Sequence, residues 1–279
     1  IDDPEAAFNA VEVSLNKALA LDPNYGKALI MLSHVIYTRG QYRFLPTKEA
    51  TERARQLLAH AVQLSPDLAE AHLTLQNFHL YEDFDWVAAE SALRRARKLD
   101  PHDFGVLVTE GEIAQIQGRH DEAIRFFRLA RDLNPLDDLG HRRVADAYYS
   151  AGRFAEAEAV FRGMIERKPQ APVRGRLAKV LLAAGKPEDA LGMLQQEAAE
   201  EDRLEYLPMM LYAVGRVAES DAALKAQIAR WGDDLPYLVV QSYAYRGDYG
   251  RAVEWLDRAY RQKDWRILFL ASDPLLKGL

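Results

Sequence analysis

Residues 118–135 read GRHDEAIRFFRLARDLNP, and residues 152–169 read GRFAEAEAVFRGMIERKP. The two stretches begin 34 residues apart, and both carry an initial glycine, an alanine five residues later and a final proline. Glycine adopts the left-handed conformation that joins two helices, and proline cannot continue the helix before it. Each stretch therefore predicts one helix that lies between two turns.

The same pattern recurs along most of the chain. Turn glycines are spaced 30 to 34 residues apart, at Gly118, Gly152, Gly185, Gly215 and Gly247. Closing prolines are spaced 34 to 43 residues apart, at Pro23, Pro66, Pro101, Pro135 and Pro169. One turn has no glycine and carries Asp83-Phe84-Asp85-Trp86 instead. Between turns, a small residue such as Ala123 lets two helices approach closely, and Phe127, four residues later, fills the space between them.

This pattern resembles the tetratricopeptide repeat, a helix–turn–helix unit of about 34 residues. The resemblance implies an all-α chain, a right-handed superhelical solenoid of antiparallel helix pairs that spans residues 1–279 as a single array. The tryptophan typical of the first helix is replaced by Leu29, His72, Leu107 and His141. We expect a lone helix at 5–21, helix pairs at 26–66, 69–101, 104–135, 138–169, 171–200, 202–231 and 234–263, and a capping or docking segment at 265–279.

Composition excludes several classes of protein. The 279 residues include 36 Lys and Arg against 42 Asp and Glu, a net charge of -6 that argues against direct nucleic-acid binding. Cysteine is absent, which excludes disulfides and thiolate metal ligands. No run of eighteen apolar residues occurs, so no membrane contact is expected. The chain starts with Ile1, which suggests a fragment of a longer protein; a cytoplasmic location is favoured, and a periplasmic one requires a membrane helix elsewhere in that protein.

The sequence shows no pattern that points to catalysis. It contains no phosphate-binding glycine loop and no two histidines four residues apart. We therefore expect no enzyme, no cofactor and no metal within these residues. His72 and His79 lie seven residues apart on one predicted helix. They suggest either a weak metal-binding or proton-sensing pair or, as we favour, two packing residues.

The resemblance implies that the first helix of each pair lines a concave groove. Tyrosine recurs at the inward positions, and its large ring and hydroxyl suit a peptide or a partner helix. We expect most of these tyrosines to be accessible. The predicted partner-binding residues are Lys27, His34, Tyr37, Asn77, Tyr81, Glu112, Gln115, Arg142, Asp146, Tyr149, Lys179, Glu205, Met209, Tyr212, Tyr237, Gln241 and Tyr245.

These observations lead to a first hypothesis about function. The chain is expected to be a protein-interaction scaffold that binds a peptide, a helix or a partner domain in its groove. The apolar segment 265–279 is expected to pack back on the last repeat or to dock on a second copy in a homodimer.

A narrower resemblance gives an alternative. Residues 81–90 and 270–275 are similar to the C-terminal repeat arrays of bacterial signalling proteins, which are fused to a class III adenylate or guanylate cyclase or to a winged-helix transcription regulator. This resemblance implies a sensory or oligomerisation region that regulates such an attached domain.

Overall fold

The structure is a computed structural model that describes residues 4–42, 44–197 and 199–279. Every regular element in these ranges is helical, and no strand occurs among them. The chain divides into two compact units, which we call unit 1 (residues 1–109) and unit 2 (residues 110–279). Ile1 lies outside the described residues. No described helix combines the length and the apolar character needed to cross a bilayer.

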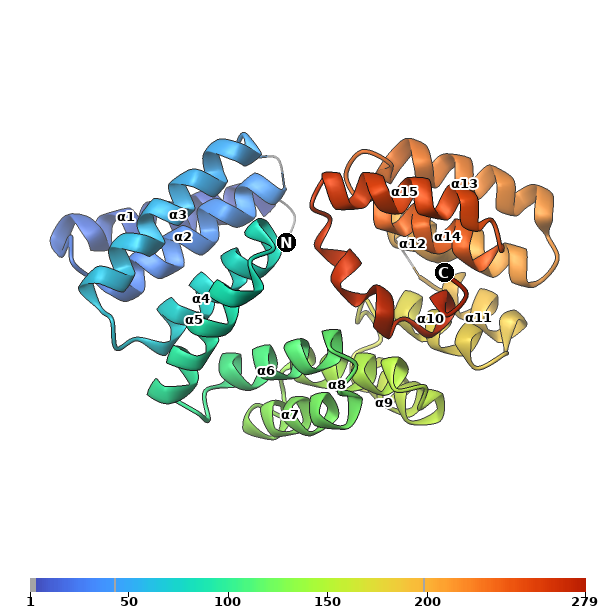
Figure 1. Cartoon of the computed structure of the whole chain (residues 1–279), viewed down its shortest axis with the longest axis horizontal. Coiled ribbons are helices and arrows are strands. Elements are labelled where there is room, and N and C mark those ends of the chain that lie inside the picture. Colours follow the sequence, from blue (N-terminus) through green and yellow to red (C-terminus); the bar gives the residue numbers. More distant parts are fainter. Residues whose placement is uncertain (1–3, 43, 198) are drawn as a thin grey trace. The chain divides into compact units, whose positions relative to one another are not determined.

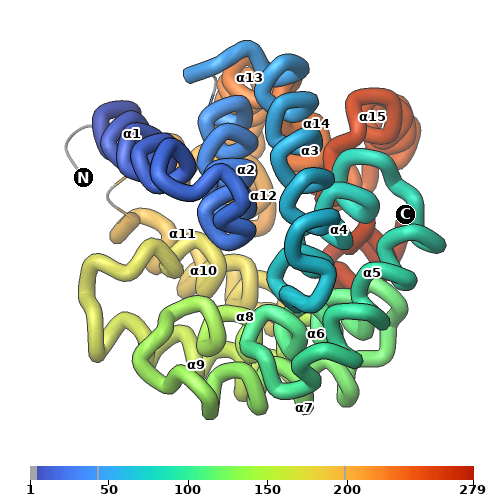
Figure 2. The backbone as a smooth tube through the Cα atoms, turned by 90° about the vertical axis from the view of Figure 1, so that its left-hand side faces the viewer, coloured from blue at the N-terminus to red at the C-terminus, as the bar shows by residue number. Residues whose placement is uncertain are grey.

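Unit 1 contains α1 to α5 and a π-helix (Figure 1). Their bounds are Pro4–Leu21 (α1), Gly26–Gln41 (α2), Thr47–Leu64 (α3), Ala69–Asn77 (α4), Phe78–Asp83 (the π-helix η1) and Trp86–Leu99 (α5). The lone helix α1 packs on α2, α2 packs on α3, and α4 packs on α5. Figure 2 shows α1, α2 and α3 side by side. The boundary between the units falls within α6 (Phe104–Ile116).

Unit 2 continues with helices in successive pairs. Their bounds are His120–Leu133 (α7), Asp138–Ser150 (α8), Phe154–Arg167 (α9), Arg174–Ala183 (α10), Pro187–Leu194 (α11), Glu200–Ala213 (α12), Val217–Trp231 (α13), Pro236–Tyr245 (α14) and Tyr249–Arg261 (α15). Two 3-10 helices follow, Trp265–Ser272 (η2) and Pro274–Leu276 (η3). The pairs α8 with α9, α10 with α11, α12 with α13 and α14 with α15 pack closely. The predicted all-α solenoid of helix pairs is confirmed.

Small and large side chains alternate in the core, as the sequence predicts. Ala123 and Ala157 are fully buried, and so are Phe127 and Phe161, four residues after each. A side chain on Gly111 would come within 2.6 Å of the Phe127 ring, so α6 lies directly on that ring. Burial of one such ring contributes about 1.5–3 kcal/mol to stability. In these two pairs, one phenylalanine ring therefore fills the space between neighbouring helices.

The turns follow the predicted glycine pattern. All five turn glycines take the left-handed conformation, with φ from 73° to 78°. In the turn that lacks glycine, Phe84 takes this conformation, with φ of 56°. Lys263 does the same after α15, with φ of 55°. The turn at Phe84 follows the π-helix η1, and an i→i+5 turn takes one residue more than an α-helical turn. That extra residue accounts for the spacing of 35 rather than 34 between Pro66 and Pro101.

Two histidines that replace the family's tryptophan close the turn before their helix. Nε2 of His72 lies 2.8 Å from the carbonyl oxygen of Pro66, and Nε2 of His141 lies 2.9 Å from that of Pro135. His79 instead faces Asp83, 3.3 Å away. His72 and His79 therefore have different partners, which favours the packing interpretation over a shared metal or proton site. The described residues contain no cluster of His, Asp and Glu that could hold a metal ion.

The C-terminal residues 265–279, which we call the strap, fold back on unit 2. Leu276 is buried in a cluster with Tyr237 and Val240, and Ile267 and Leu270 pack partly buried against it. The strap thus buries Leu276 and partly buries Ile267 and Leu270 within unit 2. Of the two arrangements expected for segment 265–279, the structure describes the one in which it packs on its own chain.

Candidate binding face

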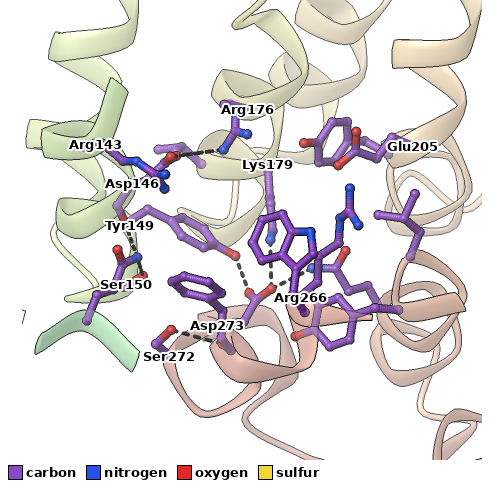
Figure 3. A pocket seen from close by; sticks show the side chains of 18 of the residues that line it. Arg143, Asp146, Tyr149, Ser150, Arg176, Lys179, Glu205, Arg266, Ser272 and Asp273 are labelled. Atoms are coloured by element: carbon purple, nitrogen blue, oxygen red, sulfur yellow. Dashed lines mark hydrogen bonds and ion pairs between the residues drawn. The ribbon is translucent and has the colours of Figure 1, made fainter. Parts of the chain in front are cut away.

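The first helices of successive pairs in unit 2 present one continuous set of side chains. Asp146 and Tyr149 lie on α8, Arg176 and Lys179 lie on α10, and Glu205 lies on α12. On α8 and on α10, the two residues are three positions apart, so both side chains lie on the same side of the helix. With Tyr237, Leu238 and Gln241 of α14 they form what we call the inner face. The inner face and the strap enclose a pocket of about 170 Å³ (Figure 3).

The inner face holds the carboxylate of Asp273, a residue of the strap. The Tyr149 hydroxyl donates to Oδ1 at 2.5 Å, while Lys179 Nζ and Gln241 Nε2 both donate to Oδ2 at 2.8 Å. The backbone N–H of Leu275 adds a bond of 3.1 Å. Asp273 is only 7% exposed, and its bonds from Tyr149 and Gln241 are buried, while those from Lys179 and Leu275 are partly buried. Three helices of the inner face thus converge on a single carboxylate (Figure 3).

This environment changes the pKa of both partners. Burial alone would raise the pKa of Asp273, but the Lys179 ammonium and the bonds from Lys179, Tyr149 and Leu275 outweigh it and lower that pKa. Burial, together with the adjacent Asp273 charge, raises the pKa of Tyr149 well above its usual value. Asp273 is therefore ionised and Tyr149 is protonated at neutral pH. A charged acceptor with a neutral donor makes a strong hydrogen bond.

Ion pairs balance the remaining charges of the pocket. Arg176 pairs with Asp146 at 3.0 Å, and Arg143 pairs with the buried Glu112. Burial and the neighbouring Arg176 and Arg143 lower the pKa of Arg142, although Asp146 and Asp137 oppose this. The inner face therefore carries both signs of charge in close contact.

The pocket brings together seven of the residues predicted from the sequence. These are Gln115, Asp146, Tyr149, Lys179, Glu205, Tyr237 and Gln241. Five predicted residues of unit 2 do not line it: Glu112, Arg142, Met209, Tyr212 and Tyr245. Met209 is fully buried in the core, and Glu112 is buried in its pair with Arg143.

The expected accessibility is wrong for two tyrosines. Tyr149 is 8% exposed and Tyr237 is 3% exposed, because the strap covers the inner face. Gln115 and Gln241 are buried as well. Tyr37, Tyr81, Tyr212 and Tyr245 are half-buried.

Sequence reasoning missed the part of the pocket that the strap supplies, and four residues of the repeats. Trp265, Arg266, Phe269, Ser272 and Asp273 line it, and so do Arg143, Ser150, Arg176 and Tyr206. The one available signal was an acidic residue, Asp273, in a segment that is otherwise apolar. A charge is expected to be buried only where it is paired.

The corresponding residues of unit 1 are arranged differently. Lys27, His34 and Asn77 are exposed, and Tyr37 donates its hydroxyl to Glu82 of the π-helix. The Tyr37 ring also meets Phe78 edge to face, at 5.1 Å between centroids. The hydroxyl and the ring of Tyr37 therefore find their partners within neighbouring repeats of unit 1.

Comparisons with known proteins identify the repeat. Two family models described as "Tetratricopeptide repeat" match, one at residues 81–138 and 117–172 and the other at residues 148–207. Human tetratricopeptide repeat protein 7B is 31% identical over 98 residues, which are 35% of this chain. The matched part spans only 12% of that relative's length.

Solved structures show a similar fold at low sequence identity. PilF of Pseudomonas aeruginosa is 20% identical with a TM-score of 0.55, over 75% of this chain and 93% of that one. The type IV pilus biogenesis factor PilW is 18% identical with a TM-score of 0.59, over 77% and 96%. Yeast Tom70 is 16% identical with a TM-score of 0.58, over 97% and 59%. These matches agree with the helix pairs and the turn glycines, and the family models show that the chain contains tetratricopeptide repeats over residues 81–207.

Proposed function

We propose that this chain is a non-catalytic scaffold whose inner face binds a peptide segment that presents an acidic side chain. Tetratricopeptide repeats serve protein–protein interaction, and their solenoids offer extended binding surfaces. The observation that carries the proposal is the set of bonds from Tyr149, Lys179 and Gln241 to one carboxylate. The strap is then the chain's own occupant of this face.

The chemistry of the face does not depend on the source of the carboxylate. Its three side-chain donors come from α8, α10 and α14, and none of them belongs to the strap. Charge-assisted hydrogen bonds of this kind fix the position of a carboxylate. The apolar residues around Leu276 supply the second element, a site for a leucine that follows the acidic residue. A partner would therefore carry an acidic residue, a turn and an apolar side chain.

The test is competition between the strap and a free peptide. A fluorescent peptide with the sequence of residues 265–279 is titrated into the full chain and into its Asp273→Asn variant, with anisotropy as the readout. The weakened strap of the variant should compete less, so the peptide should bind the variant about tenfold or more tightly than the unchanged chain. A peptide with asparagine in place of Asp273 is the matched control. Equal binding of the two peptides would contradict the proposal.

The partner that presents the acidic peptide can also be a second copy of this chain, which would give a homodimer. A strap that docks on another chain would make the same bonds between copies. Sedimentation velocity of the full chain would show a dimer that Asp273→Asn dissociates. The alternative in which the array regulates an attached cyclase or winged-helix domain stays a prediction.

A further inference from the structure

The pocket between the inner face and the strap is large enough for a small molecule. Its volume is about 170 Å³. A water molecule needs about 10–15 Å³ on the same measure, so the pocket has room for a ligand of roughly ten non-hydrogen atoms. Lys179 and Tyr149 point to Asp273 in Figure 3, whereas Arg176 and Glu205 lie in the opposite part of the view. The space beside the Asp273 contact is thus distinct from the carboxylate site itself.

Two buried side chains of the pocket have polar atoms without a protein partner. The Tyr237 hydroxyl and Gln115 Oε1 form no hydrogen bond within the described residues, and their residues are 3% and 5% exposed. The third such atom in the pocket is Arg143 Nε. A buried polar atom that lacks a partner destabilises the folded state, and a ligand that bonds to it removes that penalty. The pocket therefore offers two donors and one acceptor to a polar ligand.

The charges around the pocket restrict the class of ligand. Lys179 is paired with Asp273 at 2.8 Å, Arg176 with Asp146 at 3.0 Å and Arg266 with Asp264 at 3.3 Å. A purely anionic ligand would compete with these carboxylates for their cations. A purely cationic ligand would be repelled by the guanidinium groups. A ligand that carries both charges avoids both penalties.

The pocket has one acidic and one basic side chain that can bind the two charged groups of such a ligand. Glu205 lines the pocket and interacts with Arg176 and Tyr206. A carboxylate has two acceptor oxygens with about four lone-pair sites, so Glu205 can also accept from an ammonium group. Arg266 pairs with Asp264 at 3.3 Å, the longest of the three ion-pair distances given above. Because an arginine side chain has five N–H donors, Arg266 keeps donors for the carboxylate of a ligand.

Aromatic rings provide the apolar part of the pocket. Trp265 and Phe269 of the strap both line it and lie edge to face, with 6.0 Å between their centroids. Tyr206 lines it from α12. We infer that this pocket binds a free α-amino acid with an apolar side chain, or a zwitterion of similar size. This site goes beyond the proposed peptide binding, because its ligand requires the strap to be in place.

The test uses calorimetry and thermal unfolding of the full chain with each of the twenty standard amino acids, at up to about 10 mM. At least one apolar amino acid should bind and raise the unfolding temperature. Its N-acetyl and amide derivatives, which each lack one charge, should bind at least about tenfold more weakly. Absence of binding by all twenty, or equal binding of either derivative, would overturn the inference.

A matched pair of variants locates the site. Tyr237→Phe removes the hydroxyl that has no protein partner, so it should leave the fold intact and weaken amino-acid binding by about 3- to 10-fold. Tyr212→Phe makes the same change outside the pocket, where the hydroxyl faces the Arg246 carbonyl oxygen at 3.5 Å, and should leave binding unchanged. Equal binding by Tyr237→Phe and the unchanged chain would place the ligand elsewhere and overturn the inference. Loss of amino-acid binding would not affect the peptide competition described above, so the two proposals fail separately.

Discussion

Tyr37 in unit 1 and Tyr149 in unit 2 occupy the same position, the twelfth residue of the first helix of a pair. Both hydroxyls donate to a carboxylate, but the two acceptors differ in origin. Glu82 lies 45 residues from Tyr37, in the next helix pair, whereas Asp273 lies 124 residues from Tyr149, in the strap. The repeat therefore sets where a tyrosine stands, and a segment outside the repeat sets whether it is buried.

The sharpest way to break this comparison is to remove the distant acceptor. Asp273→Ala leaves the buried Tyr149 and Gln241 and the half-buried Lys179 without their shared partner. Loss of one member of a buried charge pair costs about 3–5 kcal/mol, so the free energy of unfolding of unit 2 should fall by that amount. Chemical denaturation with the tryptophan signal measures it, and proteolysis of the strap should accelerate.

Asp83→Ala in unit 1 is the control for that change. Asp83 binds Arg55 through two bonds of 2.9 and 3.0 Å, but both side chains are about one third exposed. An exposed ion pair contributes only about 0–1 kcal/mol. If both alanine variants lose the same stability, the strap contact is no stronger than a surface pair.

Removal of one hydroxyl in each unit makes the comparison finer. Tyr149→Phe should cost about 2 kcal/mol, since a buried bond to a charged group is lost. Tyr37→Phe should cost about 1 kcal/mol, because its contact with Glu82 is only partly buried. Each variant differs from the unchanged chain by one oxygen atom. Denaturant unfolding measures the loss in the free energy of unfolding for both. A larger loss for Tyr37→Phe would contradict the role assigned to the strap.

The sequence predicted the structural features that recur in every repeat unit. Helix pairs, turn glycines and the buried Ala123 with Phe127 all follow from spacing alone, because each depends on neighbours within one or two units. The spacing of 35 residues between Pro66 and Pro101 and the turn without glycine at Asp83-Phe84-Asp85-Trp86 both marked the place of the π-helix, but neither predicted a π-helix there.

The strap contact could not be predicted in the same way. Asp273 lies 94 residues from Lys179 and 124 from Tyr149, and no repeat position corresponds to it. The inward register predicted Tyr149, Lys179 and Gln241 for one face, and in the structure all three donate to Asp273. It could not show that the chain covers that face itself, because an apolar segment can pack on its own chain or on another.

Acid should weaken the strap contact of unit 2. The pKa of Asp273 lies below its ordinary value of 3.8 in the folded chain, so its ionised form contributes stability above about pH 4 that is lost as the pH falls through the lowered pKa. The stability difference between the unchanged chain and Asp273→Asn should be constant near neutrality and shrink below about pH 4.

In unit 1, Asp83 is the matched residue, because its pKa is also lowered. Burial opposes that shift, and the Arg55 bonds outweigh it. Asp83→Asn should change the acid transition less, since its ion pair is more exposed. An acid transition that Asp273→Asn leaves unchanged would show that this carboxylate is not responsible.

The smallest expected effect concerns two residues other than glycine that take the left-handed conformation, Phe84 in unit 1 and Lys263 in unit 2. A left-handed conformation costs a residue other than glycine about 1–2 kcal/mol. Lys263 is exposed, so Lys263→Gly should stabilise unit 2 by about 1 kcal/mol, while Lys263→Ala, which keeps the Cβ atom, should not. Phe84 is half-buried, so in Phe84→Gly the lost ring contacts should offset the same relief. Thermal unfolding of the three variants separates backbone strain from side-chain packing, because only the lysine turn should gain stability from glycine.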